Sequence, residues 1–137
     1  MNKPLPTGTP IAGAEAFLTE FARTFVHKAF RERFVHEALK KNARLHSRIC
    51  HEIEDVFPTS CAGGEPSFAA DDPCIPICGT ACDLQETRWV DLSVYVKRGF
   101  GALIASAAGD RFYAETESDY GFPYKTYTGS KHRAASA

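Results

Sequence analysis

The chain has 137 residues, of which 24% are charged and 44% are hydrophobic, and its formal net charge is -1. This length supports one core and excludes two domains of ordinary size, while the ten Phe residues predict a packed globule rather than a disordered chain. No stretch approaches the ~20 apolar residues that a membrane span needs, and residues 1–9 lack the apolar run of a secretory signal. We therefore expect one cytoplasmic domain over residues 1–137, without membrane contact.

The near-neutral total hides a polarised charge distribution. Residues 23–51 carry eight basic and two acidic side chains, a net charge of +6, whereas residues 52–119 carry four basic and thirteen acidic ones, a net charge of -9. A stripe of Lys and Arg is the electrostatic footprint of nucleic-acid binding, but it is also common on solvated helix faces. The basic segment is therefore a candidate interface, and its role depends on which side chains lie around it in the fold.

Residues 10–57 are predicted to be helical. Thr9 followed by Pro10 favours a helix start, and Pro58 is the expected stop. The segment 25–30 recurs nine residues later in similar form as 34–39. Nine residues are about two and a half turns, so the two copies would lie on opposite faces of a continuous helix. We therefore expect a break or sharp bend near residues 27–31, which gives a helix pair or one long bent helix.

Residues 58–86 are rich in Gly, Pro and Cys and are predicted to form a long loop. Apolar and polar side chains then alternate over residues 89–97, which is typical of a strand with one buried face.

A strand of small residues from Ala102 to Ala108 follows, and Gly109-Asp110 predicts a two-residue hairpin into residues 112–117. A fourth strand is expected at residues 123–128, so that antiparallel strands occupy residues 87–128, and residues 129–137 are predicted to be a flexible tail.

These elements predict an α+β fold in which the helices pack on a three- to four-stranded antiparallel β-meander. The small side chains of the strand at 102–108 require bulky side chains above them to reach normal packing density, and the Phe-rich helices can supply these. That strand is therefore expected to be central in the sheet.

Cysteine and histidine side chains form the strongest chemical signal. Cys74, Cys78 and Cys82 recur every four residues, Cys61 lies upstream, and His46 and Cys50 share one helix face. Such donors can hold a structural zinc ion, although this spacing is not that of the common zinc ribbons and fingers. The alternative is that the cysteines are free thiols and that His46, like Asn42 in the same apolar stripe, is a buried side chain with a hydrogen-bond partner.

A second hypothesis is nucleic-acid binding through the basic helical segment. No helix-turn-helix, zinc-finger or base-stacking motif accompanies the charge. The candidate contact residues are Arg23, Lys28, Arg31, Lys40, Lys41, Arg44 and Arg48.

An enzymatic function has little support in the sequence. Gly99-Phe100-Gly101 is a turn signal rather than part of a dinucleotide fingerprint, and Glu115 and Glu117 are predicted to form a solvated strand face rather than a catalytic pair. No cofactor is expected apart from the hypothetical zinc.

We predict instead a binding or regulatory module that acts through protein–protein contacts. A second helix of nearly thirty residues would be about 40 Å long, more than a domain of this size usually buries within itself, which favours self-association as a homodimer or contact with another protein.

Overall fold

The computed structural model describes residues 9–118 and 123–131 of the chain. A two-residue strand begins the described part, and short helical segments come next. The helices are α1 (Ala14–Phe25), η1 (Lys28–Phe30), α2 (Arg31–Lys40), α3 (Asn42–His51), α4 (Ile53–Val56), η2 (Thr59–Cys61), α5 (Trp89–Leu92) and η3 (Ser93–Tyr95). The strands are β1 (Thr9–Pro10), β2 (Pro73–Cys78), β3 (Gln85–Arg88), β4 (Phe100–Ser106), β5 (Arg111–Glu117) and β6 (Thr126–Ser130).

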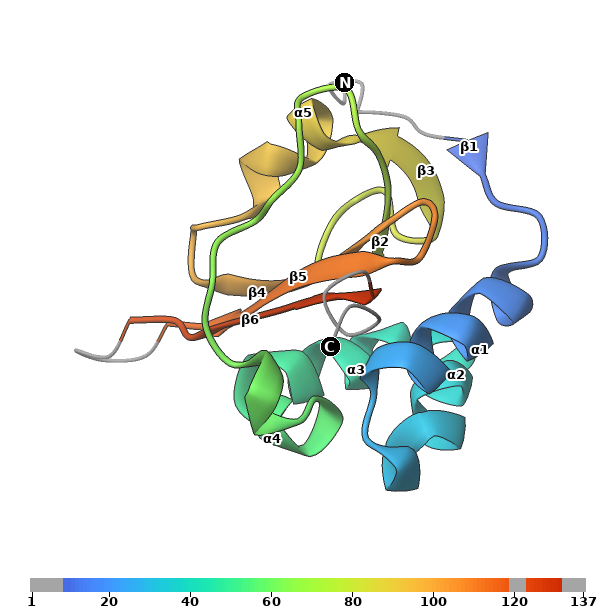
Figure 1. Ribbon diagram of the computed structural model, residues 1–137, viewed down its shortest axis with the longest axis vertical. Coiled ribbons are helices and arrows are strands. Elements are labelled where there is room, and N and C mark those ends of the chain that lie inside the picture. The colour runs from blue at the N-terminus through green and yellow to red at the C-terminus, as the bar shows by residue number, and fades with distance from the viewer. Residues whose placement is uncertain (1–8, 119–122, 132–137) are drawn as a thin grey trace, which may run out of the picture.

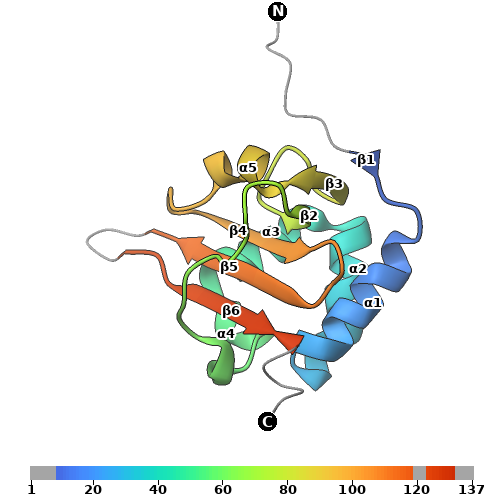
Figure 2. The ribbon, with the colours of Figure 1, turned by 45° about the horizontal axis from the view of Figure 1, so that its top comes forward.

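The described strands form one antiparallel sheet in the order β3-β2-β4-β5-β6, and β1 adds a short pairing to the edge of β3. Helices α1 to α4 lie against one face of this sheet, and α5 lies on the opposite side (Figure 1). Figure 2 shows β4 in the interior of the sheet with α3 behind it. The α+β prediction is confirmed, with five main strands instead of three or four, and the small-residue strand β4 is central as expected.

Phenylalanine rings fill the core between the helices and the sheet. Phe57 stacks on Phe112 with ring centroids 4.4 Å apart, and Phe21 meets the same Phe112 ring edge-on at 5.5 Å. Ala105 and Ala114 lie in this cluster and are fully buried. Each buried Phe stabilises the fold by roughly 1.5–3 kcal/mol, so this layer contributes a large share of the folding free energy. Large side chains from the helices thus meet small ones from the sheet.

A smaller core covers the other face of the sheet. It contains Leu92, Val96, Ile104 and Tyr113, all of which are buried. At its margin Phe68 and Trp89 contact each other with ring centroids 5.0 Å apart. Phe68, from the segment between η2 and β2, therefore packs on this second core, while Ala62 and Gly63 at the start of the segment pair with β6.

The helical region differs from the prediction in two places. The helix start predicted at Thr9 is wrong, because Thr9 and Pro10 pair with β3 and α1 begins after Gly13. The expected break near residues 27–31 is confirmed, because α1 ends at Phe25 and η1 precedes α2. The second helix is not continuous to Phe57, since the backbone leaves helical geometry at Lys41 and Glu52. The length argument for self-association therefore does not apply to this fold.

The strand region contains two further corrections. Residues 58–86, predicted to be a loop, include β2 and the start of β3. The strand predicted at residues 89–97 is instead helical as far as Tyr95, where it forms α5 and η3. Gly129 and Ser130, assigned to the tail, belong to β6, and the rest of that tail from residue 132 lies outside the described residues. Within the described part of the chain, none of the helices has the length and hydropathy needed to cross a bilayer.

Candidate functional site

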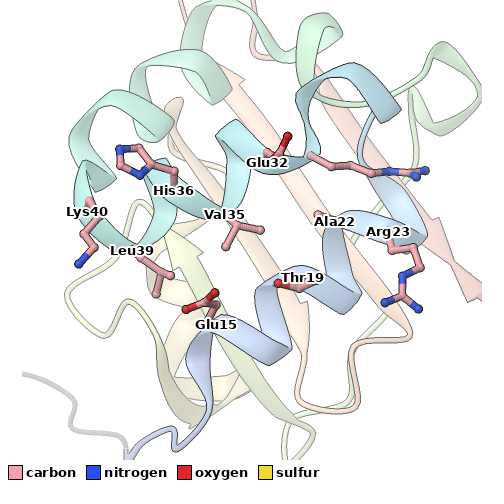
Figure 3. A pocket seen from close by; sticks show the side chains of 10 residues that line it. Glu15, Thr19, Ala22, Arg23, Glu32, Val35, His36, Leu39 and Lys40 are labelled. Carbon is pink, nitrogen blue, oxygen red and sulfur yellow. The ribbon is translucent and has the colours of Figure 1, made fainter.

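A groove of about 520 Å³ separates α1 from α2. Its floor is aliphatic and consists of buried Ala22 with half-buried Val35 and Leu39. Figure 3 shows Lys40 and Glu15 at one end of the groove and Arg23 at the other. Its volume falls in the range of roughly 300–1,000 Å³ that is usual for ligand sites. The groove therefore combines an apolar floor with charged ends.

Three of the seven basic residues proposed from the sequence line this groove, namely Arg23, Arg31 and Lys40. Arg31 donates a hydrogen bond from Nε to the Val26 carbonyl oxygen at 3.0 Å, which fixes the direction of its guanidinium. Arg23 pairs with Glu20 at 2.9 Å, but both side chains are more than half exposed, so water and ions compete for this pair. A ligand can therefore displace it at little cost.

The other four basic candidates lie elsewhere. Arg48 donates Nε and Nη2 hydrogen bonds to the two Glu37 carboxylate oxygens at 2.8 and 2.9 Å, and its guanidinium carbon lies 5.1 Å from the centre of the Phe30 ring. This intramolecular pairing joins α2 to α3. The remaining three, Lys28, Lys41 and Arg44, are exposed but do not line the groove.

Polar side chains one turn apart tie α3 to the sheet. Asn42 donates from Nδ2 to the Ile77 carbonyl oxygen at 2.8 Å, and His46 Nε2 lies 3.1 Å from the carbonyl oxygens of both Phe100 and Gly101. One turn further, the Cys50 thiol donates to the Phe100 carbonyl oxygen at 3.5 Å. Asn42 and His46 thus have the hydrogen-bond partners that were predicted for them, although both residues are half-buried rather than buried.

His46 and Cys50 are close but do not form a nucleophile and base. The Cys50 sulfur lies 3.6 Å from His46 Nε2, yet this nitrogen faces two carbonyl oxygens and must carry a proton to bond them. It therefore cannot accept the thiol proton. Burial, assisted by the Glu117 charge, raises the pKa of Cys50 to about 11, so the thiolate needed for attack is scarce at neutral pH.

Four of the six proposed metal donors divide between the two cores. Cys78 and Cys61 pack in or against the helix-side core, whereas Cys74 and Cys82 belong to the core on the other face. Among the residues that the structure describes, no group of three His, Cys, Asp or Glu side chains is arranged to hold a metal ion. The same part of the chain contains no disulfide, and burial raises the pKa of Cys74 to about 12.

A buried carboxylate that the sequence interpretation missed lies beneath the loop after η3. Glu115 is fully buried and accepts hydrogen bonds from the Tyr113 hydroxyl at 2.6 Å and from the Lys97 backbone N–H at 2.8 Å. The prediction of a solvated face is therefore wrong for Glu115. Lys97 has φ +62°, a left-handed conformation that is strained for a residue with a side chain, and these bonds hold it there. The signal available in the sequence was the i, i+2 spacing of Tyr113 and Glu115, which places both side chains on the same face of a strand.

A second, more polar cleft of about 300 Å³ lies between α3, α4 and β5. His51 and Glu117 line it and pair with each other at 3.2 Å. This cleft is smaller than the α1–α2 groove, and the His51–Glu117 contact spans it, so it offers a ligand less space than the groove does.

Comparisons of the chain with protein-family models, with curated proteins and with solved structures find no match. The functional argument therefore depends on the geometry of the groove itself.

Proposed function

We propose that this protein is a cytoplasmic binding module that holds a partner protein in the groove between α1 and α2. One observation carries the proposal: an aliphatic floor of Ala22, Val35 and Leu39 is open between two helices and has cationic side chains at both ends. Apolar surface flanked by charge is the usual composition of a protein-recognition groove. A cytoplasmic location agrees with the absence of disulfide bonds among the five cysteines, all of which lie in the described part of the chain.

Nucleic-acid binding receives less support from the same geometry. Arg48 is occupied by Glu37, and the cations of the groove surround an aliphatic floor with Glu15 and Glu32 beside them. Single-stranded nucleic acid is usually held by aromatic side chains on which bases stack, and among the described residues His36 is the sole ring in this groove, with no Phe, Tyr or Trp beside it. A metal- or thiol-dependent function receives less support too, because the four cysteines at positions 61, 74, 78 and 82 lie in two separate cores.

Site-specific photo-crosslinking in the cell that makes the protein tests the proposal. A photoreactive phenylalanine analogue at Thr19, which lines the groove, should give a discrete adduct with another protein. The same analogue at Thr24, an exposed position on the same helix that does not line the groove, should not. An adduct at the mass of two copies would instead identify self-association. Equal labelling from the two positions, or none from either, would refute the groove as the binding surface.

A further inference from the structure

We infer that the groove recognises an amphipathic helix with acidic side chains at both ends of its apolar stripe. This inference depends on the proposed function and adds the chemistry of the partner. It has three parts, which concern the conformation of the partner, the sign of its charge and the spacing of its charged residues.

The partner segment is helical because the groove cannot satisfy an extended backbone. Both walls, α1 and α2, are helices whose N–H and C=O groups bond within the helix along most of its length. An extended peptide over Ala22, Val35 and Leu39 would leave its own N–H and C=O groups without partners on an apolar floor. A helix satisfies these groups internally and presents only side chains, which is the helix-in-groove mode of recognition.

The partner is acidic because basic side chains outnumber acidic ones in the groove lining and on the helical surface around it. Arg23, Arg31 and Lys40 outnumber Glu15 and Glu32 in the lining. Exposed Lys28, Arg33, Lys41 and Arg44 extend the positive surface around the same two helices and the start of α3. Acidic side chains on the partner gain from this potential, whereas basic ones are repelled before contact.

The groove also sets the spacing of the partner's charges. Arg31 and Lys40 are the first and last residues of α2, and nine residues of helix span about 14 Å. A helix lying along this wall reaches both cations when its acidic residues are about seven to eleven positions apart. Two or three apolar residues at i, i+3 or i+4, and i+7 then face Val35 and Leu39.

A designed peptide tests these three parts directly. The probe is a fluorescein-labelled, end-capped helical peptide with three Leu residues in one stripe and two Glu residues at each end. One control peptide has the same composition in scrambled order, and another has Lys in place of every Glu. Fluorescence anisotropy with the full chain should give a Kd on the order of 10 μM for the first peptide and at least about tenfold weaker binding for both controls.

Matched variants of the protein locate the binding site. Thr19→Trp fills the groove and should weaken binding about tenfold, whereas Thr24→Trp on the same helix should leave it unchanged. Reversing Arg23 and Lys40 to Glu should weaken binding more than reversing Lys28 and Lys41, which changes the net charge equally outside the groove. Circular dichroism checks that all four variants keep their helix content.

Five results would overturn the inference. Equal binding of the scrambled peptide, or equal loss in the two charge-reversed variants, would mean that charge alone drives association. Equal or tighter binding of the Lys peptide would refute the acidic preference. Absence of binding at about 100 μM would refute a helical ligand of this type. A labelled RNA or DNA oligonucleotide that binds through Arg23 and Lys40 while the peptide does not would assign the groove to nucleic acid.

The two proposals fail in distinguishable ways. A specific adduct from Thr19 in the cell, together with no binding of the designed peptide, would leave the groove as a protein-binding surface with a different ligand. Peptide binding that Thr19→Trp does not weaken would place the helix elsewhere on the protein and refute the inference.

Discussion

Removing Arg48 should lower the free energy of unfolding more than removing the charge of its partner Glu37. The Glu37 side chain is 3% exposed and that of Arg48 is 19% exposed, so the carboxylate lies deeper than the guanidinium. Replacing Arg48 by Met removes both hydrogen bonds to a carboxylate that is almost fully buried. Leaving a buried charge without its partner costs about 3–5 kcal/mol of the free energy of unfolding.

Removing the charge of Glu37 instead of Arg48 should lower the free energy of unfolding by a smaller amount. In Glu37→Gln the guanidinium keeps its contact with the Phe30 ring, lies 3.4 Å from a Glu52 carboxylate oxygen, and is partly open to solvent. We expect a loss of about 1–2 kcal/mol. The double variant Glu37→Leu with Arg48→Met removes both charges and should lie within about 1 kcal/mol of the wild type, because no unpaired charge remains.

Urea unfolding followed by circular dichroism measures all three variants. Arg23→Met is the matched control, because it removes an Arg from an exposed pair with Glu20 and should change the free energy of unfolding by less than about 0.5 kcal/mol. The reasoning is refuted if Arg48→Met costs no more than Glu37→Gln or no more than this control. A double variant as unstable as Arg48→Met alone would contradict it as well.

Three further predictions concern the sheet and the thiols. Gly101→Ala should destabilise the fold by about 2–4 kcal/mol in urea unfolding, because φ is +83° and the added Cβ overlaps the Cys50 sulfur, and adding Cys50→Ala should recover part of the loss. Burial raises the pKa of Cys50 to about 11 and that of Cys74 to about 12 in the folded protein. The unfolded chain therefore loses these two protons at a lower pH than the folded protein does. The free energy of unfolding should therefore fall as pH rises from about 8 to 11, and a double Cys50→Ala, Cys74→Ala variant that shows the same fall would refute this cause. A chelator should leave the urea midpoint of the reduced protein unchanged, and a drop in that midpoint, or stoichiometric zinc by elemental analysis, would reinstate the metal site.

Sequence periodicity predicted the fold class but misassigned residues 89–97. Leu92 and Val96 are buried, whereas Val90 and Val94 are 41% and 54% exposed. The buried positions therefore repeat every four residues, which fits a helical turn, and the intervening Val residues completed a false two-residue alternation. Over so short a segment the two periods share the positions i and i+4, and only packing against the second core separates them.

Other errors arose where tertiary contacts override local signals. The two Pro residues of Pro73–Cys78 favoured a loop, but β2 accommodates Pro76 at a shift in its register with β4. The helix breaks at Lys41 and Glu52 involve neither Gly nor Pro, so the sequence contained no local signal for them. They turn α3 so that its apolar and polar side chains meet the sheet.

The candidate site was only partly visible in the sequence. Arg23, Arg31 and Lys40 were identified by charge, but the groove also needs the floor from Val35 and Leu39, which depends on how α1 and α2 are placed side by side. Arg48 looked equivalent to the other cations, and only its contact with Glu37 reveals a structural role. The charges in the sequence identify candidate binding residues, but only the fold shows which of these side chains already have an intramolecular partner.

The hydrogen bonds of Asn42, His46 and Cys50 to the sheet also affect the groove. Directional bonds at three successive turns prevent α3 from sliding or rotating on the sheet, as a helix held by apolar contacts alone can do. A single residue, Lys41, joins α3 to α2, so the wall that carries Val35 and Leu39 is fixed by the same bonds. The groove is thus preorganised, and a ligand that enters it loses little affinity to ordering of the protein.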